Sequence, residues 1–168
     1  MTSAGAGNGA ARVRHKKKNG AAATVHIDLG PLADWVGFNL RMAQEATFQA
    51  FSHRSQEIGE SPGRFATLML ISRNPGISQT ELSYASGRDK SSLTPVVEDL
   101  VRRGLVERKR MDRDRRVYRL SLTAEGKKTL ALMVRCAREH ERVLDGIIGT
   151  RDRKRFIDVL KRLAAELG

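Results

Sequence analysis

The chain has 168 residues, of which 40% are hydrophobic, so it can bury one substantial core and still form additional helices. Lys and Arg number 31 against 19 Asp and Glu, which gives a formal charge of +12 and makes a polyanion such as DNA, RNA or an anionic membrane the expected partner. A single cysteine excludes an internal disulfide, and no stretch approaches the roughly 18 apolar residues of a membrane span, so we expect a cytoplasmic protein.

Residues 1–23 are rich in Gly, Ala and Asn and contain basic residues but no acidic ones. Such a segment has too few apolar groups to offset the entropic cost of ordering, so we expect a disordered basic tail. Its charge suits contact with phosphates and equally suits a role in solubility. The basic residues are Arg12, Arg14, Lys16, Lys17 and Lys18.

The first long helix is expected to begin at Gly30-Pro31, because proline is favoured in the first helical turn. Apolar residues then keep helical spacing for about five turns, over residues 32–51. A second apolar set, Trp35, Phe38 and Met42, lies more than a quarter turn further round the helix. This helix is therefore covered on two sides, either inside a larger core or with one side against a partner subunit or a ligand.

The next two helices have clear start and stop signals. Ser61-Pro62 is typical of a helix start, and Asn74-Pro75-Gly76 ends that helix. Ser78 and Glu81 have the spacing of a capping box, in which both side chains bond to backbone N–H groups at a helix start. Gly87 is the expected end of this second short helix.

Residues 89–103 continue with apolar side chains at helical spacing, and Gly104 is the expected stop. Pro95 interrupts this pattern because it lacks an N–H and crowds the preceding turn. We expect either a local bend or a helix that begins near Ser91 or Ser92.

Residues 105–110 and 117–122 have the pattern of two strands, with a charged stretch between them. They predict a hairpin with a basic tip, which we call the wing. Thr123 and Thr150 are the expected N-caps of two further helices.

Two short helices joined by a glycine turn and followed by a hairpin predict a winged helix-turn-helix. Its second helix can enter the major groove of DNA, and the wing can reach the neighbouring backbone or minor groove. Hydroxyl and cationic side chains gather at the N-terminal end of that helix, where free N–H groups can also meet a phosphate. The candidate DNA contacts there are Arg88, Lys90, Ser91, Ser92 and Thr94.

The wing is rich in arginine, which suits phosphate pairing and insertion into a narrow minor groove. Asp114 is unfavourable beside DNA unless it braces an arginine, and Arg116 is its expected partner. The alternative is a solvated, charged turn. The candidate DNA contacts in the wing are Arg110, Arg113, Arg115 and Arg116.

Residues 74–126 resemble the DNA-binding core of the MarR family of bacterial regulators, most specifically in Asp114-Arg115-Arg116 followed by Leu122-Thr123 and Gly126. The likeness extends over roughly residues 32–167. It implies a mainly α fold with a small β-hairpin, in which long dimerisation helices flank the winged helix-turn-helix core. The expected parts are the tail (1–23), an N-terminal dimerisation helix (24–60), the DNA-binding domain (61–123) and C-terminal dimerisation helices (124–168).

The resemblance also implies a homodimer that binds double-stranded DNA at a pseudo-palindromic site. Family members usually repress, and they release DNA when a small, often aromatic and anionic ligand occupies a cavity. We expect an aromatic acid or its coenzyme A thioester as effector, although plain packing also explains apolar side chains at helical spacing. The candidate ligand contacts are Trp35, Phe38, Arg41, Met42, His53, Arg54, Arg64, Phe65 and Met69.

Other classes fit less well. The four histidines lack the spacing of metal ligands or a nucleophile partner, and no phosphate-cradling glycine motif is present, so neither an enzyme nor a cofactor is expected. Relatives that sense oxidants do so through a cysteine in the first helix, whereas Cys136 lies in the penultimate helix and is expected to pack. The remaining alternative is a non-specific architectural protein that binds nucleic acid through its charge.

Overall fold

The computed structural model describes residues 27–110 and 118–168. The chain divides into two compact units, residues 1–48 and 49–168. Within the described residues, no helix is both long enough and apolar enough to cross a membrane.

The described part of the first unit starts with three residues outside any helix or strand, followed by a 3-10 helix, Gly30–Asp34, and then by α1, Val36–Arg54, whose residues 49–54 belong to the second unit. The expectation of one continuous helix from the Gly-Pro dipeptide is wrong, because Trp35 is extended, with φ −79° and ψ 124°. Asn39 stabilises this break, since its Nδ2 donates to the carbonyl oxygens of Ala33 and Trp35, both at 2.9 Å. Trp35 therefore precedes α1 and is not part of its apolar face.

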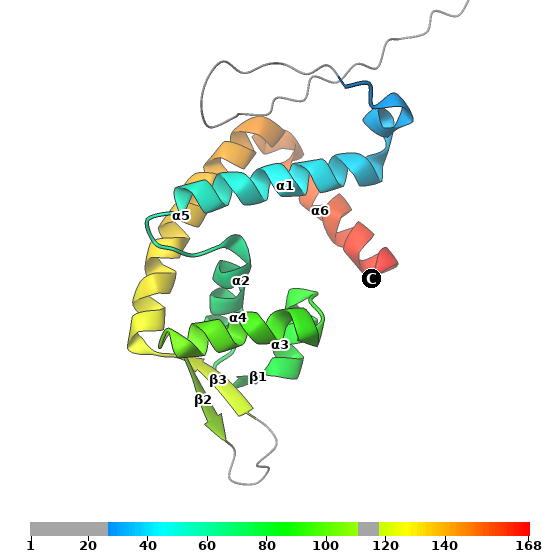
Figure 1. The fold of residues 1–168 in the computed structure, drawn as a ribbon. Helices are drawn as coiled ribbons and strands as arrows, with labels where there is room; N and C mark the ends of the chain where they lie inside the picture. Colours follow the sequence, from blue (N-terminus) through cyan, green and yellow to red (C-terminus); the bar gives the residue numbers. More distant parts are fainter. Residues whose placement is uncertain (1–26, 111–117) are drawn as a thin grey trace, which may run out of the picture. The chain divides into compact units, whose positions relative to one another are not determined.

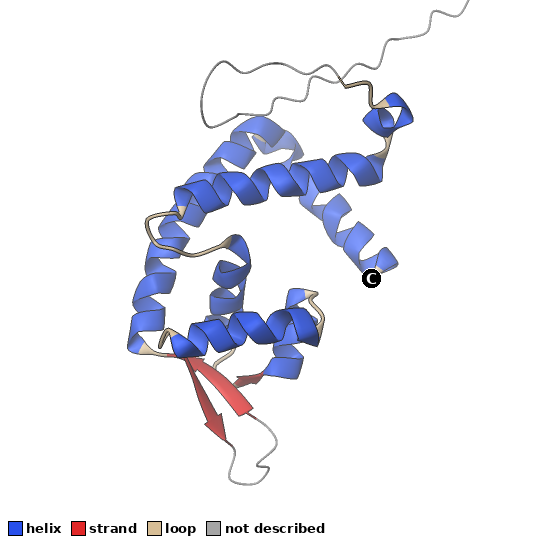
Figure 2. Cartoon of the chain, in the orientation of Figure 1, coloured by secondary structure: helices blue, strands red, loops and turns tan. Residues whose placement is uncertain are grey.

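The second unit is mainly helical and contains a small antiparallel sheet, as the sequence predicts. Its further elements are α2 (Pro62–Arg73), β1 (Ile77–Ser78), α3 (Gln79–Ser86), α4 (Lys90–Arg102), β2 (Val106–Arg110), β3 (Tyr118–Leu122), α5 (Ala124–Ile148) and α6 (Thr150–Leu167). Figures 1 and 2 show β2 and β3 extending beyond α3 and α4. The wing thus projects on the side of the unit that carries the helix pair.

The sheet contains one strand more than the predicted hairpin. β2 and β3 pair as expected, and β1 pairs with the other edge of β3, which gives the order β1-β3-β2. Ile77 of β1 lies opposite Leu120, and Val106 of β2 lies opposite Leu122. A strand of two residues has no alternation that a sequence pattern could reveal. β1 joins the turn before α3 directly to the wing.

One apolar core holds α2, α3, α4 and the sheet together. Burying one such side chain stabilises the fold by about 1.5–3 kcal/mol, so packing fixes where α4 lies relative to α3 and the wing. The fully buried side chains of this core are Leu68 and Ile71 of α2, Leu82 of α3, Leu93, Val97 and Leu100 of α4, Val106 of β2 and Leu120 of β3.

The predicted starts of α2, α3 and α5 are confirmed by their caps. The Ser61 hydroxyl caps α2. Ser78 Oγ accepts a hydrogen bond from Glu81 N at 3.2 Å, and the Glu81 carboxylate accepts one from Ser78 N at 2.7 Å, which completes the capping box of α3. Thr123 Oγ1 accepts a bond from Gly126 N at 3.0 Å at the start of α5. Each cap satisfies N–H groups that a helix start leaves without partners.

The start of α4 differs from the expectation. The helix begins at Lys90, with Asp89 as its cap, rather than near Ser91 or Ser92, and it continues through Pro95. The Asp89 carboxylate accepts the backbone N–H of Ser92 at 2.8 Å, so the first turn is fixed before the proline is reached. Pro95 lies only one turn further on, where few intrahelical bonds are lost.

The start of α6 also differs. Thr150 is the first residue of α6 and not its cap; Gly149 precedes it with φ 84°, and no side chain of the described residues caps the first turn. Instead Arg153 joins α6 to α5, because its Nε donates to Asp145 at 2.5 Å and its Nη2 to Glu141 at 3.2 Å. Long-range ion pairs of this kind leave no local sequence signal.

The junction between the wing and α5 is a close backbone contact. Gly126 is buried, and a Cβ on it would lie 2.0 Å from the carbonyl oxygen of Leu105, which only glycine avoids. Thr123 supports the same junction, since its Oγ1 donates to the carbonyl oxygen of Gly104 at 2.7 Å and its N–H to that of Leu105 at 3.1 Å. The base of the wing is therefore fixed to the start of α5.

Candidate nucleic-acid interface

Asp89 organises the reading end of α4, which we define as residues 88–95. Its Oδ1 accepts hydrogen bonds from Ser92 N at 2.8 Å and from Ser91 Oγ at 2.5 Å. Ser92 Oγ donates to the Asp89 carbonyl oxygen at 3.0 Å. These bonds, first the one from Ser91, hold the pKa of the Asp89 carboxyl well below its usual range. The carboxylate therefore stays ionised, and both serine hydroxyls donate inward.

Thr94 connects α4 to α3. Its Oγ1 donates to the carbonyl oxygen of Lys90 at 2.7 Å and accepts a bond from Gln79 Nε2 at 2.6 Å. Gln79 is the first residue of α3 and was not among the residues that the sequence singled out. Nothing in its local pattern indicates a partner fifteen residues away. The position of Thr94 in the reading end thus depends on the preceding helix.

The two cations of the reading end lie in different surroundings. Arg88 follows Gly87, whose left-handed conformation, φ 62°, ends α3 as predicted. The half-buried Arg88 side chain turns back to α2, and its Nη1 lies 3.1 Å from where a Cβ on Gly63 would be. Lys90 is exposed. Of the two, Lys90 is the one whose charge is available at the surface.

On the wing, Tyr118 orders two arginines. Nε and Nη2 of Arg110 donate to the Tyr118 hydroxyl at 3.0 and 2.8 Å, and the Arg110 Cζ lies 5.4 Å from the ring centre. The Arg108 Cζ lies 6.0 Å from the same ring, and its Nε and Nη2 are buried without a hydrogen-bond partner among the described residues. Cations over an aromatic face are attracted by its negative charge density. Tyr118 is a site residue that sequence reasoning missed.

Arg119 of β3 joins the wing to α3. Its Nη1 donates to the carbonyl oxygen of Gly76 at 3.1 Å and to the Glu81 carboxylate at 3.2 Å. Hydrogen bonds from Ser78, and then the charge of Arg119, lower the pKa of Glu81. Arg119 thus has a structural role. Four residues that the sequence predicts at the wing tip, Arg113, Asp114, Arg115 and Arg116, lie outside the described residues.

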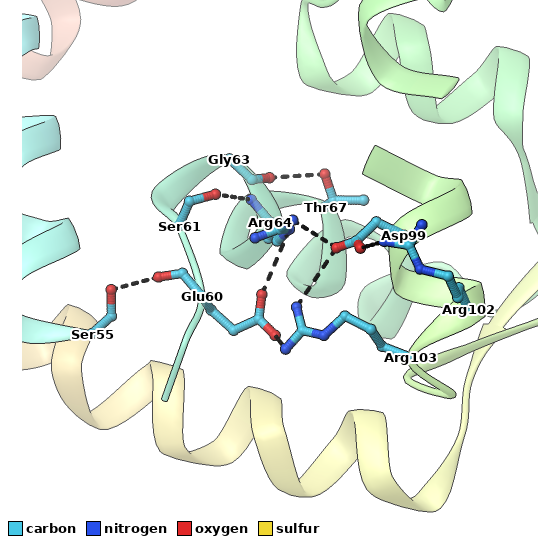
Figure 3. A network of polar contacts seen from close by, with 9 residues as sticks. All are labelled: Ser55, Glu60, Ser61, Gly63, Arg64, Thr67, Asp99, Arg102 and Arg103. Atoms are coloured by element: carbon cyan, nitrogen blue, oxygen red, sulfur yellow. Dashed lines mark hydrogen bonds and ion pairs between the residues drawn. The ribbon is translucent and has the colours of Figure 1, made fainter. Parts of the chain in front are cut away.

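Buried charge connects the C-terminal end of α4 to α2 (Figure 3). Glu60, just before α2, has a fully buried carboxylate that lies 2.6 Å from Arg103 Nη2 and 3.9 Å from Arg64 Nε. The Glu60 carbonyl oxygen accepts a bond from Ser55 Oγ at 2.6 Å. The hydrogen bond to Glu60 is the main reason that the pKa of Arg103 is raised. An unpaired charge at this depth would be costly, so these partners depend on one another.

Asp99 of α4 is the second acid of this charge network. Its Oδ2 lies 2.6 Å from Arg64 Nη2 and 3.7 Å from Arg103 Nη1, and its Oδ1 pairs with Arg102. Arg64 therefore bridges both acids and joins α2 to α4. Asp99 therefore helps to fix the position of α4.

A groove of about 460 Å³ lies between α2 and α5. Phe65 and Met69 of α2 line it, as the sequence suggests for a ligand, together with apolar side chains of α5. Arg138 and Arg142 provide its cations. The two acids that line it, Glu141 and Asp145, are paired with Arg153, whereas no ion pair joins Arg138 or Arg142 to another described residue. The groove thus has an apolar wall and a positive rim.

The predicted ligand cations of the second unit do not line this groove. Arg64 belongs to the charge network, so an anion beside it would compete with two carboxylates. His53 and Arg54 are exposed at the end of α1, where the Arg54 carbonyl oxygen lies 3.7 Å from Cys136 Sγ. Arg138 and Arg142 were not singled out because charges on a long amphipathic helix are usually solvated.

The remaining ligand candidates lie in the first unit. Trp35 is 60% exposed, and Met42 is also exposed. Arg41 lies over the Phe38 ring with its Cζ 5.8 Å from the ring centre, and its Nη2 donates to Met42 Sδ at 3.4 Å. These four side chains form a partly exposed apolar and cationic surface at the start of α1.

His140 of α5 is buried beside aromatic rings. Its ring packs edge-on against Phe51, which in turn stacks on Phe65, with centroids 5.6 Å apart in both pairs. Nδ1 has no hydrogen-bond partner among the described residues. Burial, and then the charge of Arg54, lowers the pKa of His140, while Glu141 opposes the shift. Folding thus favours the neutral form of the His140 ring. No group of three or more His, Cys, Asp or Glu that could hold a metal occurs in the described part of the chain.

Winged helix-turn-helix proteins place the leading end of the second helix in the major groove and the wing over the adjacent backbone. The second unit has this arrangement of α3, α4 and the wing (Figure 1), and so it belongs to this class of DNA-binding proteins.

Comparison with known proteins identifies the family within this class. The MarR family model matches residues 61–118. A protein of Thauera aromatica, described as a transcriptional regulatory protein for the hcr operon, is 32% identical over 151 residues, which cover 89% of this chain and 91% of the relative. Two structures of the transcriptional repressor CouR are also similar. The one bound to a 23-mer DNA duplex has 31% identity and a TM-score of 0.77 over 83% of this chain and 99% of that chain. The one bound to p-coumaroyl-CoA has 29% identity and a TM-score of 0.76 over 83% and 98%. The chain belongs to the MarR family and is a DNA-binding transcriptional regulator; these relatives are regulators rather than enzymes.

Proposed function

We propose that this regulator is a homodimeric repressor that binds a pseudo-palindromic operator and leaves it when a small aromatic acid, or its coenzyme A thioester, binds. The observation that carries the proposal is that one unit presents both the capped reading end of α4 and a wing whose arginines are ordered by Tyr118. The likeness to a repressor supports the direction of regulation. A protein with this task acts beside the chromosome, and we place it in the cytoplasm.

We infer that the reading end enters the major groove and that the wing reaches the neighbouring minor groove. The start of α4 carries the partial positive charge of a helix N-terminus, and the exposed Lys90 adds to it. Arg110, oriented by Tyr118, is the wing arginine closest to the tip among the described residues. The proposed contacts are Lys90, Ser91, Ser92 and Thr94 with Arg110, Arg113, Arg115 and Arg116, and Asp114 is proposed to brace Arg116. Arg88, whose side chain turns back to α2, is proposed to meet the phosphate backbone rather than a base.

We place the dimer interface on exposed apolar side chains of α5 and α6. Ile147 is 77% exposed and Leu167 is 82% exposed, and Phe156 and Leu160 are exposed on the same helix as Leu167. On α6 these residues recur at helical spacing and form one stripe. A contiguous apolar surface in solvent marks an interaction site, and a second copy would cover it. Two-fold symmetry then presents two reading ends to the two half-sites.

The effector is assigned to the groove between α2 and α5. Phe65 and Met69 offer an apolar wall to an aromatic ring, and Arg138 and Arg142 offer cations to a carboxylate or phosphate. The similarity to CouR, which has been solved with p-coumaroyl-CoA, supports an aromatic acyl thioester as the first compound to test.

The DNA part is tested by selecting bound sequences from a random duplex library and footprinting the selected site. We expect one defined site with two symmetric half-sites, retained against excess random DNA. Binding that is lost to random competitor and falls steeply with salt would indicate the architectural alternative. Arg110→Ala and Arg116→Ala should weaken binding to every sequence. Arg135→Ala, which removes an exposed arginine of α5, is the matched control.

The effector part is tested by calorimetry with p-coumaroyl-CoA, p-coumarate and free coenzyme A, followed by DNA release. The double variant Arg138→Gln and Arg142→Gln should bind the active compound more weakly while retaining operator affinity. Arg135→Gln on the same helix should behave like the unmodified protein. If none of the three compounds binds or releases DNA, the proposed effector class is wrong.

A further inference from the structure

The outward side of α4 has an apolar centre. Ser91, Pro95 and Glu98 are exposed, and their spacing of four and then three residues places them in one line along the helix. The opposite side, which carries Leu93 and Val97, is buried in the core. Pro95 therefore occupies the middle of the surface that faces away from the protein.

The hydroxyl groups around Pro95 have already used their hydrogens. Ser91 donates to the Asp89 carboxylate, and Ser92 and Thr94 donate to carbonyl oxygens. A hydroxyl group has a single hydrogen, and here it is already donated within the protein. These three hydroxyl groups can therefore only accept a hydrogen bond from another partner. Arg88, the arginine closest in sequence, turns back to α2. The reading end thus offers acceptors and apolar groups, with Lys90 at its margin.

Base pairs differ in the donors, acceptors and apolar groups that they present in the major groove. Guanine presents two acceptors, N7 and O6, in the major groove and needs donors such as an arginine fork. An A·T pair presents the adenine amino group, which is a donor, and the thymine methyl group, which is apolar. A G·C pair also presents one donor, the cytosine amino group, but it has no apolar group. A surface of acceptors and apolar groups therefore matches an A·T pair best, because only that pair offers a methyl group.

We propose that Pro95 is a specificity-determining residue, whose ring contacts the methyl group of a thymine in each half-site, with the methyl group of Thr94 adding to the contact. The inference rests on the proposed function, because it requires that the reading end enters the major groove. It goes further by predicting an A·T pair at the centre of each half-site, read without an arginine.

Deoxyuridine tests this directly, because it lacks only the methyl group of thymine. The DNA is the duplex selected by the full chain from a random library, with each thymine replaced in turn. At the contacted position, removing one methyl group should weaken binding about fourfold, and replacement in both half-sites roughly fifteenfold. If no single or symmetric replacement changes the Kd by more than about twofold, the inference is wrong.

Two variants assign the effect to its residues. Pro95→Ala should keep the fold, since alanine favours helices, and circular dichroism checks this. It should reduce the penalty for deoxyuridine to less than about twofold. Thr94→Ser removes a methyl group but keeps the hydroxyl bonded to Gln79, and should reduce the penalty partially. Glu98→Ala is the matched control, because Glu98 is exposed on the same helix and is not a proposed DNA contact, and it should leave the penalty unchanged. A full penalty in folded Pro95→Ala would overturn the assignment.

The two levels of the proposal fail differently. If the selection returns no defined sequence, the proposed function fails. If it returns a defined, symmetric sequence whose thymine methyl groups can all be removed without effect, the function stands and the reading role of Pro95 fails.

Discussion

Each end of α4 carries an aspartate, but the two aspartates differ in their surroundings and in their roles. At the N-terminal end, the exposed Asp89 bonds to hydroxyl and backbone groups of its own turn. At the C-terminal end, Asp99 is 13% exposed and pairs with arginines of two helices. Water stabilises an exposed carboxylate even without partners, whereas a buried carboxylate depends on them. Substitutions at the first end should therefore affect DNA binding most, and substitutions at the second should affect stability most.

The largest effect is expected from Glu60→Ala. It removes the buried carboxylate that pairs with Arg103 and Arg64. We expect a loss of about 2 kcal/mol in the free energy of unfolding, below the roughly 3–5 kcal/mol of a fully buried pair, because the side chains of Arg64 and Arg103 are 33% and 34% exposed. Chemical denaturation measures it, with the exposed Glu57→Ala as control. Equal stabilities for the two variants would contradict a structural role of the charge network.

A double-mutant cycle on Arg64 and Asp99 sharpens the same point. Their charged atoms lie 2.6 Å apart and join α2 to α4. Removing both side chains should cost less than the sum of the single losses, with a coupling energy of about 1 kcal/mol. Operator affinity, measured under conditions in which all the variants are folded, should change less than threefold. Additive losses would mean that the pair is not an energetic unit.

At the reading end, Asp89→Ala should change DNA binding more than stability. It removes the cap and releases Ser91 and Ser92, so we expect roughly fivefold weaker operator binding with a smaller fall in Tm than for Glu60→Ala. Asp89→Ser, which retains a capping oxygen, should bind nearly normally. Folding lowers the pKa of Asp89. The stability that its carboxylate contributes is therefore present above the ordinary pKa of 3.8 and is lost only as pH falls through the lower folded value. If the unmodified protein at pH 5 bound the operator as weakly as Asp89→Ala does, this interpretation would be contradicted.

The smallest expected effect concerns His140. Its folded pKa lies below the ordinary value of 6.5, so below that value the unfolded chain binds a proton that the folded chain does not. Stability should therefore be complete at pH 8 and decrease as pH falls through 6.5 towards the folded value. His140→Phe should flatten this part of the Tm profile, whereas replacement of the exposed His53 should leave it intact. An unchanged slope in His140→Phe would contradict the assignment.

Local signals predicted much of the fold. Ser78, Glu81 and Gly87 were identified because caps and left-handed turns require particular residues within a few positions. The start of α4 was misplaced because Pro95 was given more weight than the cap at Asp89. The break at Trp35 depends on two hydrogen bonds of the Asn39 side-chain amide, and propensity scales do not include such bonds.

The site was predicted less completely, for a different reason. Its polar residues could be located on α4 from their spacing, but their partners come from other elements. Gln79 holds Thr94, Tyr118 holds Arg110, and α2 takes the side chain of Arg88. Which groups remain available to DNA is a consequence of these tertiary contacts.

Gly126 gives the wing a mechanical property. The backbone of α5 packs against Leu105 too closely for even a methyl group, and Thr123 bonds to Gly104 and Leu105 at the same place, so we expect a stiff junction. α5 and the base of the wing are then expected to rotate together. In the proposed dimer, a small rotation of α5 would move the two wings by a larger distance. The rotation of α5 would then set the distance between the wings and, with it, the spacing of half-sites that the dimer can bind.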